Sequence, residues 1–198
     1  MGYLNDKMMD RQTTLYSLIG TDVLSAGLEM EFNEKFKEID INSKILPLNI
    51  REDDIGFFLN GFKDSQMKAA YFTKEYWTVL PELLVDMSDE VKACGIADIV
   101  SVKNAHNIAE VVYGKAVTSL IKKMLDLENS TISFSNHLPT SLSILYNLER
   151  EKTGQMSLLH KESDIMIGED IVIKGRKIEY EQILKEIADI KTKEWANV

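Results

Sequence analysis

Short apolar segments alternate with amphipathic segments from residue 15 onward, and this alternation is the strongest constraint on the fold. The segments 15–20, 45–50 and 68–73 are apolar and short enough to form buried strands. Between them, Phe32 and Phe36 have the spacing of one helical face. Strands that alternate with helices in this way predict an α/β fold with a parallel or mixed sheet.

The alternation continues to the end of the chain and predicts a division into two lobes. Residues 97–102 and 108–113 flank the sequence KNAHN and are typical of a β-hairpin, and a long helix follows them. The pattern restarts near 127–131 and ends in an amphipathic helix, whose predicted buried face carries Ile183, Leu184, Ile187 and Ile190. We expect a polar arm at 1–14, a first lobe at 15–126 and a smaller α/β lobe at 127–198.

The charge and the single cysteine restrict the partners and the compartment. With 23 basic and 32 acidic residues the net charge is −9, so a nucleic acid or an anionic membrane surface would be repelled. Neither is expected as a partner. Cys94 has no second cysteine to pair with, which favours a reducing compartment. No apolar run approaches the roughly 20 residues that a membrane span needs, and a cytoplasmic protein is predicted.

The sequence does not predict a metal site. His106, His137 and His160 are scattered without the spacing of metal ligands, and Cys94 has no other ligand type nearby. An aromatic group lies at 71–77, with the sequence YFTKEYW. It is either core packing or a surface on which a planar ligand stacks, and core packing is favoured because aromatic residues at strand-to-helix junctions are usually buried.

Five stretches of the first lobe follow the motifs of one enzyme family in order and in spacing. Gly20, Asn33 and Phe36 fit G-x-P-I-x-H-S-x-S-P-x-x-H-N-x-x-F, and a second strand and acidic-capped helix end at LNGF. YFTKEYW, followed by VLPELL, fits N-V-T-x-P-x-K. SDEVKACGIADIVSV fits the stretch around G-A-V-N-T-V, and EVVYGKAVTSLI fits G-Y-N-T-D-G-x-G-F. Residues 15–126 thus resemble the substrate-binding domain of the shikimate dehydrogenase family.

The resemblance implies a site whose polar residues this chain has replaced. Family members hold a hydroxylated ring carboxylate with two serines and use a lysine–aspartate pair beside the reacting hydroxyl. Here the two serine positions carry Ala26 and Leu28, the motif histidine is Phe32, the asparagine of G-A-V-N-T is Asp98, and the aspartate falls on Ala116. The lysine position falls on Trp77 or Tyr76, with Lys74 able to reach the same space. Of the polar residues in the family motifs, this chain keeps Asn33 and Thr73.

The resemblance also implies a nucleotide-binding second lobe, which in this chain would be a reduced Rossmann-like lobe. In the family a glycine-rich turn follows its first strand, because backbone amides must approach a pyrophosphate there. Here TISFS is followed by NHLPTSL, which contains no glycine. We therefore predict no bound NAD or NADP and no other cofactor.

These observations predict a divergent shikimate-dehydrogenase-like protein that has lost the dehydrogenase residues and binds a small molecule or acts as an assembly or accessory protein. The predicted ligand contacts are Asn33, Thr73, Asp98 and Tyr113. One alternative is an enzyme of another reaction type that uses Lys74, Tyr76, Asp98 or Lys115 as acid or base. Another is an NADP-dependent shikimate-type oxidoreductase. The partner is a small molecule in the cleft between the lobes or another protein chain, including a second copy of this one.

Overall fold

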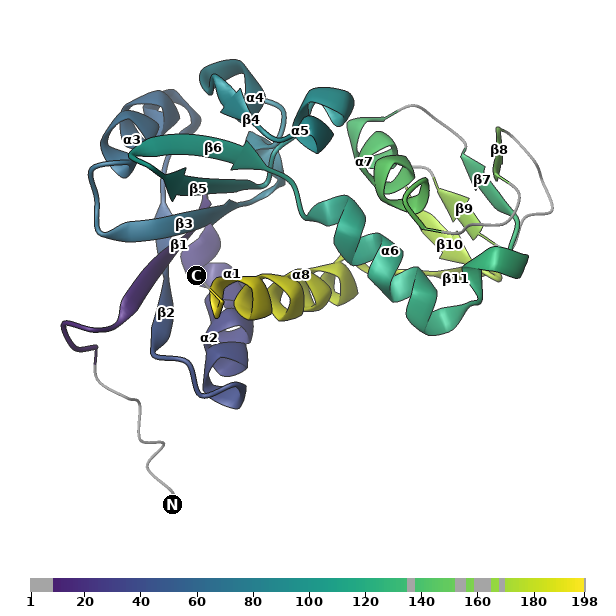
Figure 1. Ribbon diagram of the computed structural model, residues 1–198, viewed down its shortest axis with the longest axis horizontal. Coiled ribbons are helices and arrows are strands. Elements are labelled where there is room, and N and C mark those ends of the chain that lie inside the picture. Colours follow the sequence, from purple (N-terminus) through teal and green to yellow (C-terminus); the bar gives the residue numbers. More distant parts are fainter. Residues whose placement is uncertain (1–8, 135–137, 152–155, 159–164, 168–169, 198) are drawn as a thin grey trace.

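The computed structural model describes residues 9–134, 138–151, 156–158, 165–167 and 170–197, and it contains two mixed β-sheets joined by helices (Figure 1). The predicted α/β class is confirmed. The first sheet has the strand order β2-β1-β3-β5-β6-β4, in which only β5 runs antiparallel to its neighbours. Its strands are β1 (Thr14–Gly20), β2 (Ser43–Asn49), β3 (Met67–Phe72), β4 (Asp86–Met87), β5 (Ile99–Lys103) and β6 (His106–Glu110).

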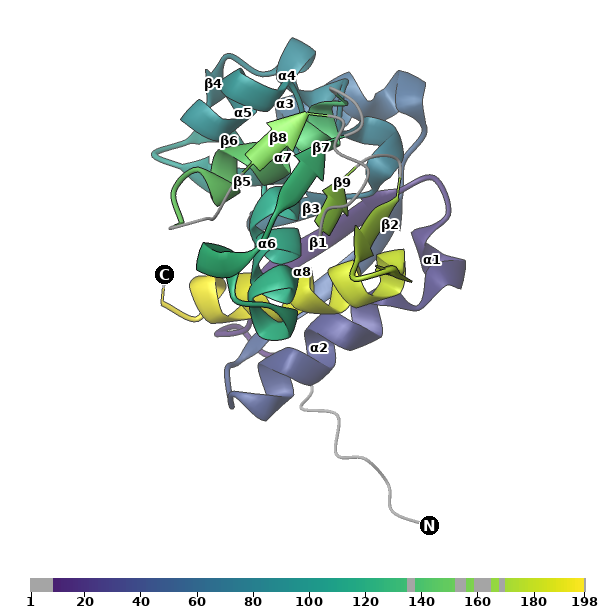
Figure 2. The same ribbon diagram turned by 90° about the vertical axis from the view of Figure 1, so that its right-hand side faces the viewer.

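The second sheet has the order β11-β10-β9-β7-β8 and faces the viewer in Figure 2. Its strands are β7 (Ile132–Phe134), β8 (Met156–Leu158), β9 (Ile165–Ile167), β10 (Ile171–Ile173) and β11 (Arg176–Lys177). β8 and β9 are parallel to β7, whereas β10 and β11 form an antiparallel hairpin. The hairpin turns at Lys174 and Gly175, both with positive φ, which is the backbone that matches the twist of the two strands.

Helices cover both faces of the first sheet and connect it to the second. They are α1 (Val23–Ala26), α2 (Leu28–Glu38), α3 (Ile55–Phe62), α4 (Leu80–Leu83), α5 (Asp89–Cys94), α6 (Tyr113–Met124), α7 (Pro139–Leu148) and α8 (Tyr180–Trp195). Helix α5 is a direct product of its sequence: the Ser88 hydroxyl accepts from the Val91 amide at 3.3 Å, and Gly95 ends the helix at φ 74°. No helix among the described residues is long and apolar enough to cross a membrane.

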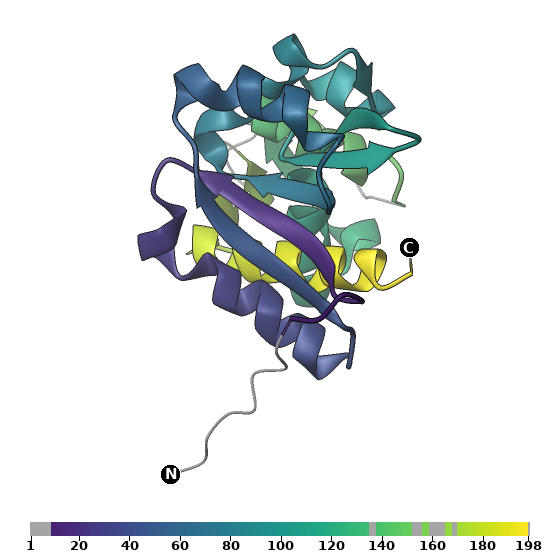
Figure 3. The ribbon, with the colours of Figure 1, turned by 90° about the vertical axis from the view of Figure 1, so that its left-hand side faces the viewer.

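The last helix returns from the second sheet to the first. Figures 1 and 3 show α8 passing beside α2, beneath the first sheet. Trp195, at its end, stacks on Tyr16 of β1 with ring centroids 4.2 Å apart and planes 9° apart. On the predicted buried face, Ile183 and Ile187 are buried and Leu184 and Ile190 are partly buried. One apolar core therefore runs from the first sheet through α6 and α8 to the second sheet.

Candidate functional site

The ends of β1 and β3 meet at Thr73, one of the predicted ligand contacts. Its backbone amide and its hydroxyl both donate to the carbonyl of Ile19, at 2.9 and 3.1 Å. A side chain at Gly20 would collide with Thr73 and Val23, so only glycine fits this close approach. The Thr73 hydroxyl is thus already bonded to the sheet.

Asn33 connects α2 to β2, which is an edge strand of the first sheet. Its amide nitrogen donates to the carbonyl of Ile45 at 3.2 Å, and its amide oxygen accepts from the Ile45 amide at 3.0 Å. The side chain therefore occupies the free hydrogen-bonding side of the edge strand. Its role as a ligand contact stays a prediction, and a ligand would have to compete with this backbone pair.

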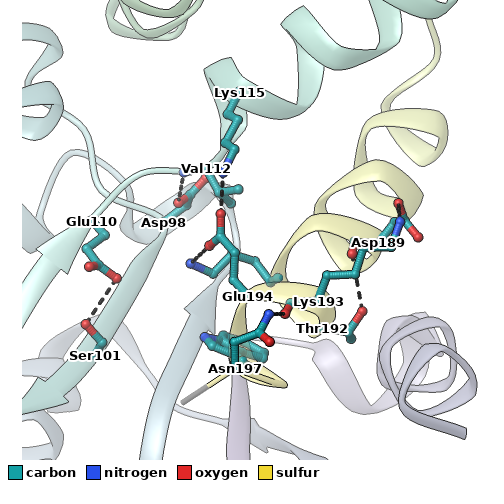
Figure 4. A network of polar contacts seen from close by, with 12 residues as sticks. Asp98, Ser101, Glu110, Val112, Lys115, Asp189, Thr192, Lys193, Glu194 and Asn197 are labelled. Atoms are coloured by element: carbon teal, nitrogen blue, oxygen red, sulfur yellow. Dashed lines mark hydrogen bonds and ion pairs between the residues drawn. The ribbon is translucent and has the colours of Figure 1, made fainter. Parts of the chain in front are cut away.

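Asp98 lies before β5 and is completely buried. One carboxylate oxygen accepts from the Val112 amide at 2.8 Å (Figure 4). The other accepts from the Tyr113 amide at 2.9 Å. These amides belong to the start of α6, whose first N–H groups have no partner within the helix. Burial raises the pKa of Asp98 to about 7, although the two amides act in the opposite direction. In this position Asp98 holds the N-terminus of α6.

Several aromatic side chains are packed close to Asp98. The rings of Trp77 and Tyr113 lie 5.1 Å apart at 57°, and both side chains are buried. Tyr180, from the start of α8, lies beside Tyr71 and beneath the Lys74 ammonium, which is 4.8 Å from its ring centroid. Burial raises the pKa of Tyr113 and of Tyr180 to about 12, so both remain neutral phenols near neutral pH. The aromatic residues at 71–77 are confirmed as core packing.

The four acid–base candidates do not form one cluster. The Tyr76 hydroxyl donates to the carbonyl of Ile50, and its ring is buried on the α3 side of the first sheet. Lys115, on α6, forms an ion pair with Glu194 of α8. Lys74 contacts Tyr180, and Asp98 binds the start of α6. Any catalytic role for these four residues stays a prediction.

A cavity that the sequence did not predict lies farther along α8. Its volume is about 660 Å³. It is bounded by the first sheet, by the start of α6, by α7 and by the end of α8, where Lys191, Glu194 and Trp195 contribute side chains. Glu90, on α5, lines it and accepts hydrogen bonds from Ser143 and Asn147 of α7, at 2.9 and 2.7 Å. Burial raises the pKa of Glu90 above its usual range.

One sequence signal could have pointed to this cavity. Lys191 follows Ile183 and Ile187 at four-residue steps, so it lies on the apolar face of the last helix. A charged residue on such a face needs a buried partner. Glu90 and Glu194 have no comparable signal, because each lies on a helix surface among other charged residues.

The described residues contain no group of three or more His, Cys, Asp or Glu side chains that could hold a metal ion. His106 is exposed and lies 3.3 Å from Asp86, and Cys94 is a buried free thiol. His137 and His160 lie outside the described residues, as does the start of the segment after β7 where a nucleotide would bind in the family. The predicted absence of a nucleotide therefore stays a prediction.

Comparisons with known proteins give one sequence relative and many similar folds. No family model matches the sequence. The NADP(+) shikimate dehydrogenase of Methanococcus maripaludis is 23% identical over 171 residues, which are 86% of this chain and 61% of the relative. The chain thus spans less than two thirds of that enzyme's length.

The similar solved structures share the fold at low sequence identity. The shikimate 5-dehydrogenase of Listeria monocytogenes, solved with shikimate and NAD, has a TM-score of 0.67 at 14% identity, over 94% of this chain and 60% of the enzyme. A 5-ketofructose reductase from Gluconobacter has a TM-score of 0.64 at 10% identity, over 81% of this chain and 70% of the reductase. In sequence and in fold, the chain therefore resembles the shikimate dehydrogenase family, as its motifs predict.

Proposed function

We propose that this protein is a divergent relative of the shikimate dehydrogenases that binds a small molecule and does not transfer hydride between shikimate and NADP. The observation that carries this proposal is the Trp77–Tyr113 pair, with ring centroids 5.1 Å apart. Matching YFTKEYW to N-V-T-x-P-x-K places Trp77 at the lysine. An aromatic pair would then stand where the family has its lysine–aspartate pair.

The start of α6 supports Tyr113 as the counterpart of the aspartate. In the family motif the aspartate precedes a glycine, and here Tyr113 precedes Gly114 in the first turn of the helix. The alternative counterpart, Ala116, lies one turn farther on and is buried. In either alignment the residue at the aspartate position itself has no carboxylate, although Asp98 accepts from the Tyr113 amide nearby. A buried phenol with a pKa of about 12 is a poor proton acceptor near neutral pH.

The remaining polar residues support the same conclusion. The polar groups of Asn33, Thr73 and Asp98 are bonded to backbone groups of Ile45, Ile19 and the start of α6. A ligand at the strand ends would have to break bonds that hold the fold, which costs binding energy. These residues therefore act in this proposal as structural supports.

Binding of shikimate and NADP can be tested by thermal unfolding with a bona fide shikimate dehydrogenase as the control. A ligand at about 100 times its dissociation constant stabilises a protein by about 2.7 kcal/mol, which moves the midpoint by a few degrees. We expect the control enzyme to shift with both ligands and this protein with neither. A saturable shift with both ligands would contradict the proposal.

A second candidate function is supported by Glu90. This carboxyl group has a raised pKa, lines the 660 Å³ cavity and lies beside the hydroxyl of Ser143. An acid with a perturbed pKa in a cavity is a common mark of acid–base catalysis. Lys115, one of the predicted acid–base candidates, lines the same cavity. An enzyme of another reaction type would use this pair, and a Glu90→Gln variant would then lose turnover of its substrate.

A further inference from the structure

The cavity at the end of α8 is separate from the strand ends described by the family motifs. Tyr180, at the strand ends, and Glu194, in the cavity, are on the same helix. At about 1.5 Å per residue they lie roughly 20 Å apart along its axis. The volume of about 660 Å³ falls within the range of small-molecule sites, roughly 300–1,000 Å³.

Lys191 is a buried cation in the wall of this cavity. Its side chain is only 8% exposed, and its ammonium donates to one oxygen of Glu194 at 2.8 Å. The ring centroid of Trp195 lies 5.7 Å from the same ammonium. An ammonium has three N–H donors, and among the described residues Glu194 is the acceptor found for Lys191. The side chain lines the cavity, so its remaining donors take an acceptor from the cavity, either water or a ligand.

A second cation shares the same carboxylate. Lys115 pairs with the other oxygen of Glu194, so two ammonium groups lie on one carboxylate. Burial alone would raise the pKa of Glu194, but Lys191 and Lys115 lower it below its usual value. Glu194 is therefore ionised, and the group formed by these three side chains carries one positive charge in excess.

The neighbouring carboxylates do not cancel this excess by direct contact. Glu110 is paired with Lys103 at 2.6 Å. Glu90 accepts hydrogen bonds from Ser143 and Asn147, and it interacts with Lys115 only over a longer distance. Both oxygens of Asp98 are bonded to backbone amides at the start of α6, and its interaction with Lys191 is likewise electrostatic without a direct contact. The lining as a whole is balanced, with five cations and five carboxylates, and its local excess of positive charge lies where Lys191 and Lys115 share the carboxylate of Glu194.

We propose that this cavity binds a small organic anion whose carboxylate or phosphate accepts hydrogen bonds from Lys191 and Lys115. The anion supplies an acceptor for the remaining donors of Lys191, and Arg150 adds a further cation among the lining residues. Ser101 and Asn147 also line the cavity, but the Ser101 hydroxyl already donates to Glu110 and the Asn147 amide to Glu90, so only their oxygens are left to accept from polar groups of the ligand. The proposal rests on the proposed function only in that the protein binds a small molecule.

The test measures binding of benzoate, inorganic phosphate and the neutral isostere benzamide to the whole chain by isothermal titration calorimetry. We expect saturable binding of at least one of the two anions in the millimolar range or tighter, and none of benzamide. A preference between benzoate and phosphate distinguishes a carboxylate ligand from a phosphate ligand. Equal binding of benzamide, or no binding of either anion, would overturn the proposal.

Variants locate the binding. Lys191→Met keeps the length of the side chain and should weaken anion binding at least tenfold. Lys193→Met is the matched control, because Lys193 is on the same helix, is 61% exposed and pairs with Asp189 outside the cavity. If Lys191→Met does not fold, Lys115→Met at the more exposed cation gives the same test. Unchanged affinity in the folded variant would overturn the proposal.

The result that would contradict the proposed function differs from the result that would contradict anion binding. Turnover of shikimate with NADP would contradict the loss of dehydrogenase activity, and it would leave anion binding at Lys191 untouched. Unchanged anion binding in Lys191→Met would do the reverse. The two proposals are therefore separated by one assay of turnover and one of binding.

Discussion

Asp98 gives the sharpest test of the electrostatics at the centre of this molecule. Its carboxylate is fully buried, and burial raises its pKa from an ordinary value of 3.8 to about 7. The native state therefore holds a proton that the unfolded state has released between these two pH values. The unfolding free energy must then fall as the pH rises through this window, because the native state binds more protons there.

The size of the effect follows from the same two values. Each tenfold change in an acid's dissociation constant is worth 1.36 kcal/mol, so the gap between 3.8 and about 7 corresponds to on the order of 4 kcal/mol. An Asp98→Asn variant has no such titration, and its amide oxygen can still accept from one of the two α6 amides. The difference in unfolding free energy between wild type and variant should therefore change with pH. This change is independent of any constant difference that the substitution itself causes.

The assay is urea unfolding of both proteins at about pH 4.5, about pH 6 and about pH 7.5, with linear extrapolation to water. We expect the wild type to lose stability relative to Asp98→Asn as the pH rises, by about 3 kcal/mol between the first and the last pH, because about 1 kcal/mol of the full effect is already lost at about pH 4.5. A wild type that gains stability relative to the variant over this range would refute the reasoning. It would mean that the two amides and the helix dipole hold the folded pKa below 3.8.

Three further substitutions test the packing. Gly114→Ala should lower the free energy of unfolding by about 1–3 kcal/mol, because a β-carbon there collides with the backbone of Ser143. Denaturant unfolding measures this change, and an unchanged stability would contradict the close approach of α6 and α7. Asn33→Ala should cost about 1–2 kcal/mol and speed amide exchange in β2, which loses its side-chain partners; unchanged exchange would count against this role. Trp195→Ala should lower the free energy of unfolding by about 3–5 kcal/mol and speed hydrogen exchange in α8, because the Trp195 ring stacks on Tyr16. Amides of α8 that stay protected in the variant would contradict this expectation.

Helices and strands were predictable where neighbouring residues in the sequence determine them. The apolar run at 15–20 and the paired Phe32 and Phe36 are enough for β1 and α2, and both are observed. Ser88 and Gly95 mark both ends of α5. After β3 no comparable signal marks the local structure, which is a 3₁₀ turn at Lys74–Tyr76 followed by the short helix α4.

The site was less predictable, because its key contacts join residues that are distant in sequence or are made by backbone atoms. Asp98 was expected to contact a ligand, but the donors to its carboxylate are two backbone amides, which no side-chain pattern reveals. The contact between Trp77 and Tyr113 joins two motifs, and only the observed start of α6 at Tyr113 relates them. The shared carboxylate of Glu194 likewise requires the return of α8 to the first sheet.

Loss of dehydrogenase activity is tested by an assay of NADPH formation with shikimate and NADP, monitored by absorbance, with a shikimate dehydrogenase run in parallel. We expect no rate above the enzyme-free background at any pH at which the protein is folded. That result follows if Trp77 and Tyr113 occupy the place of the lysine and the aspartate. A saturable rate proportional to protein concentration would contradict the account and show that another pair of residues supplies the acid–base chemistry.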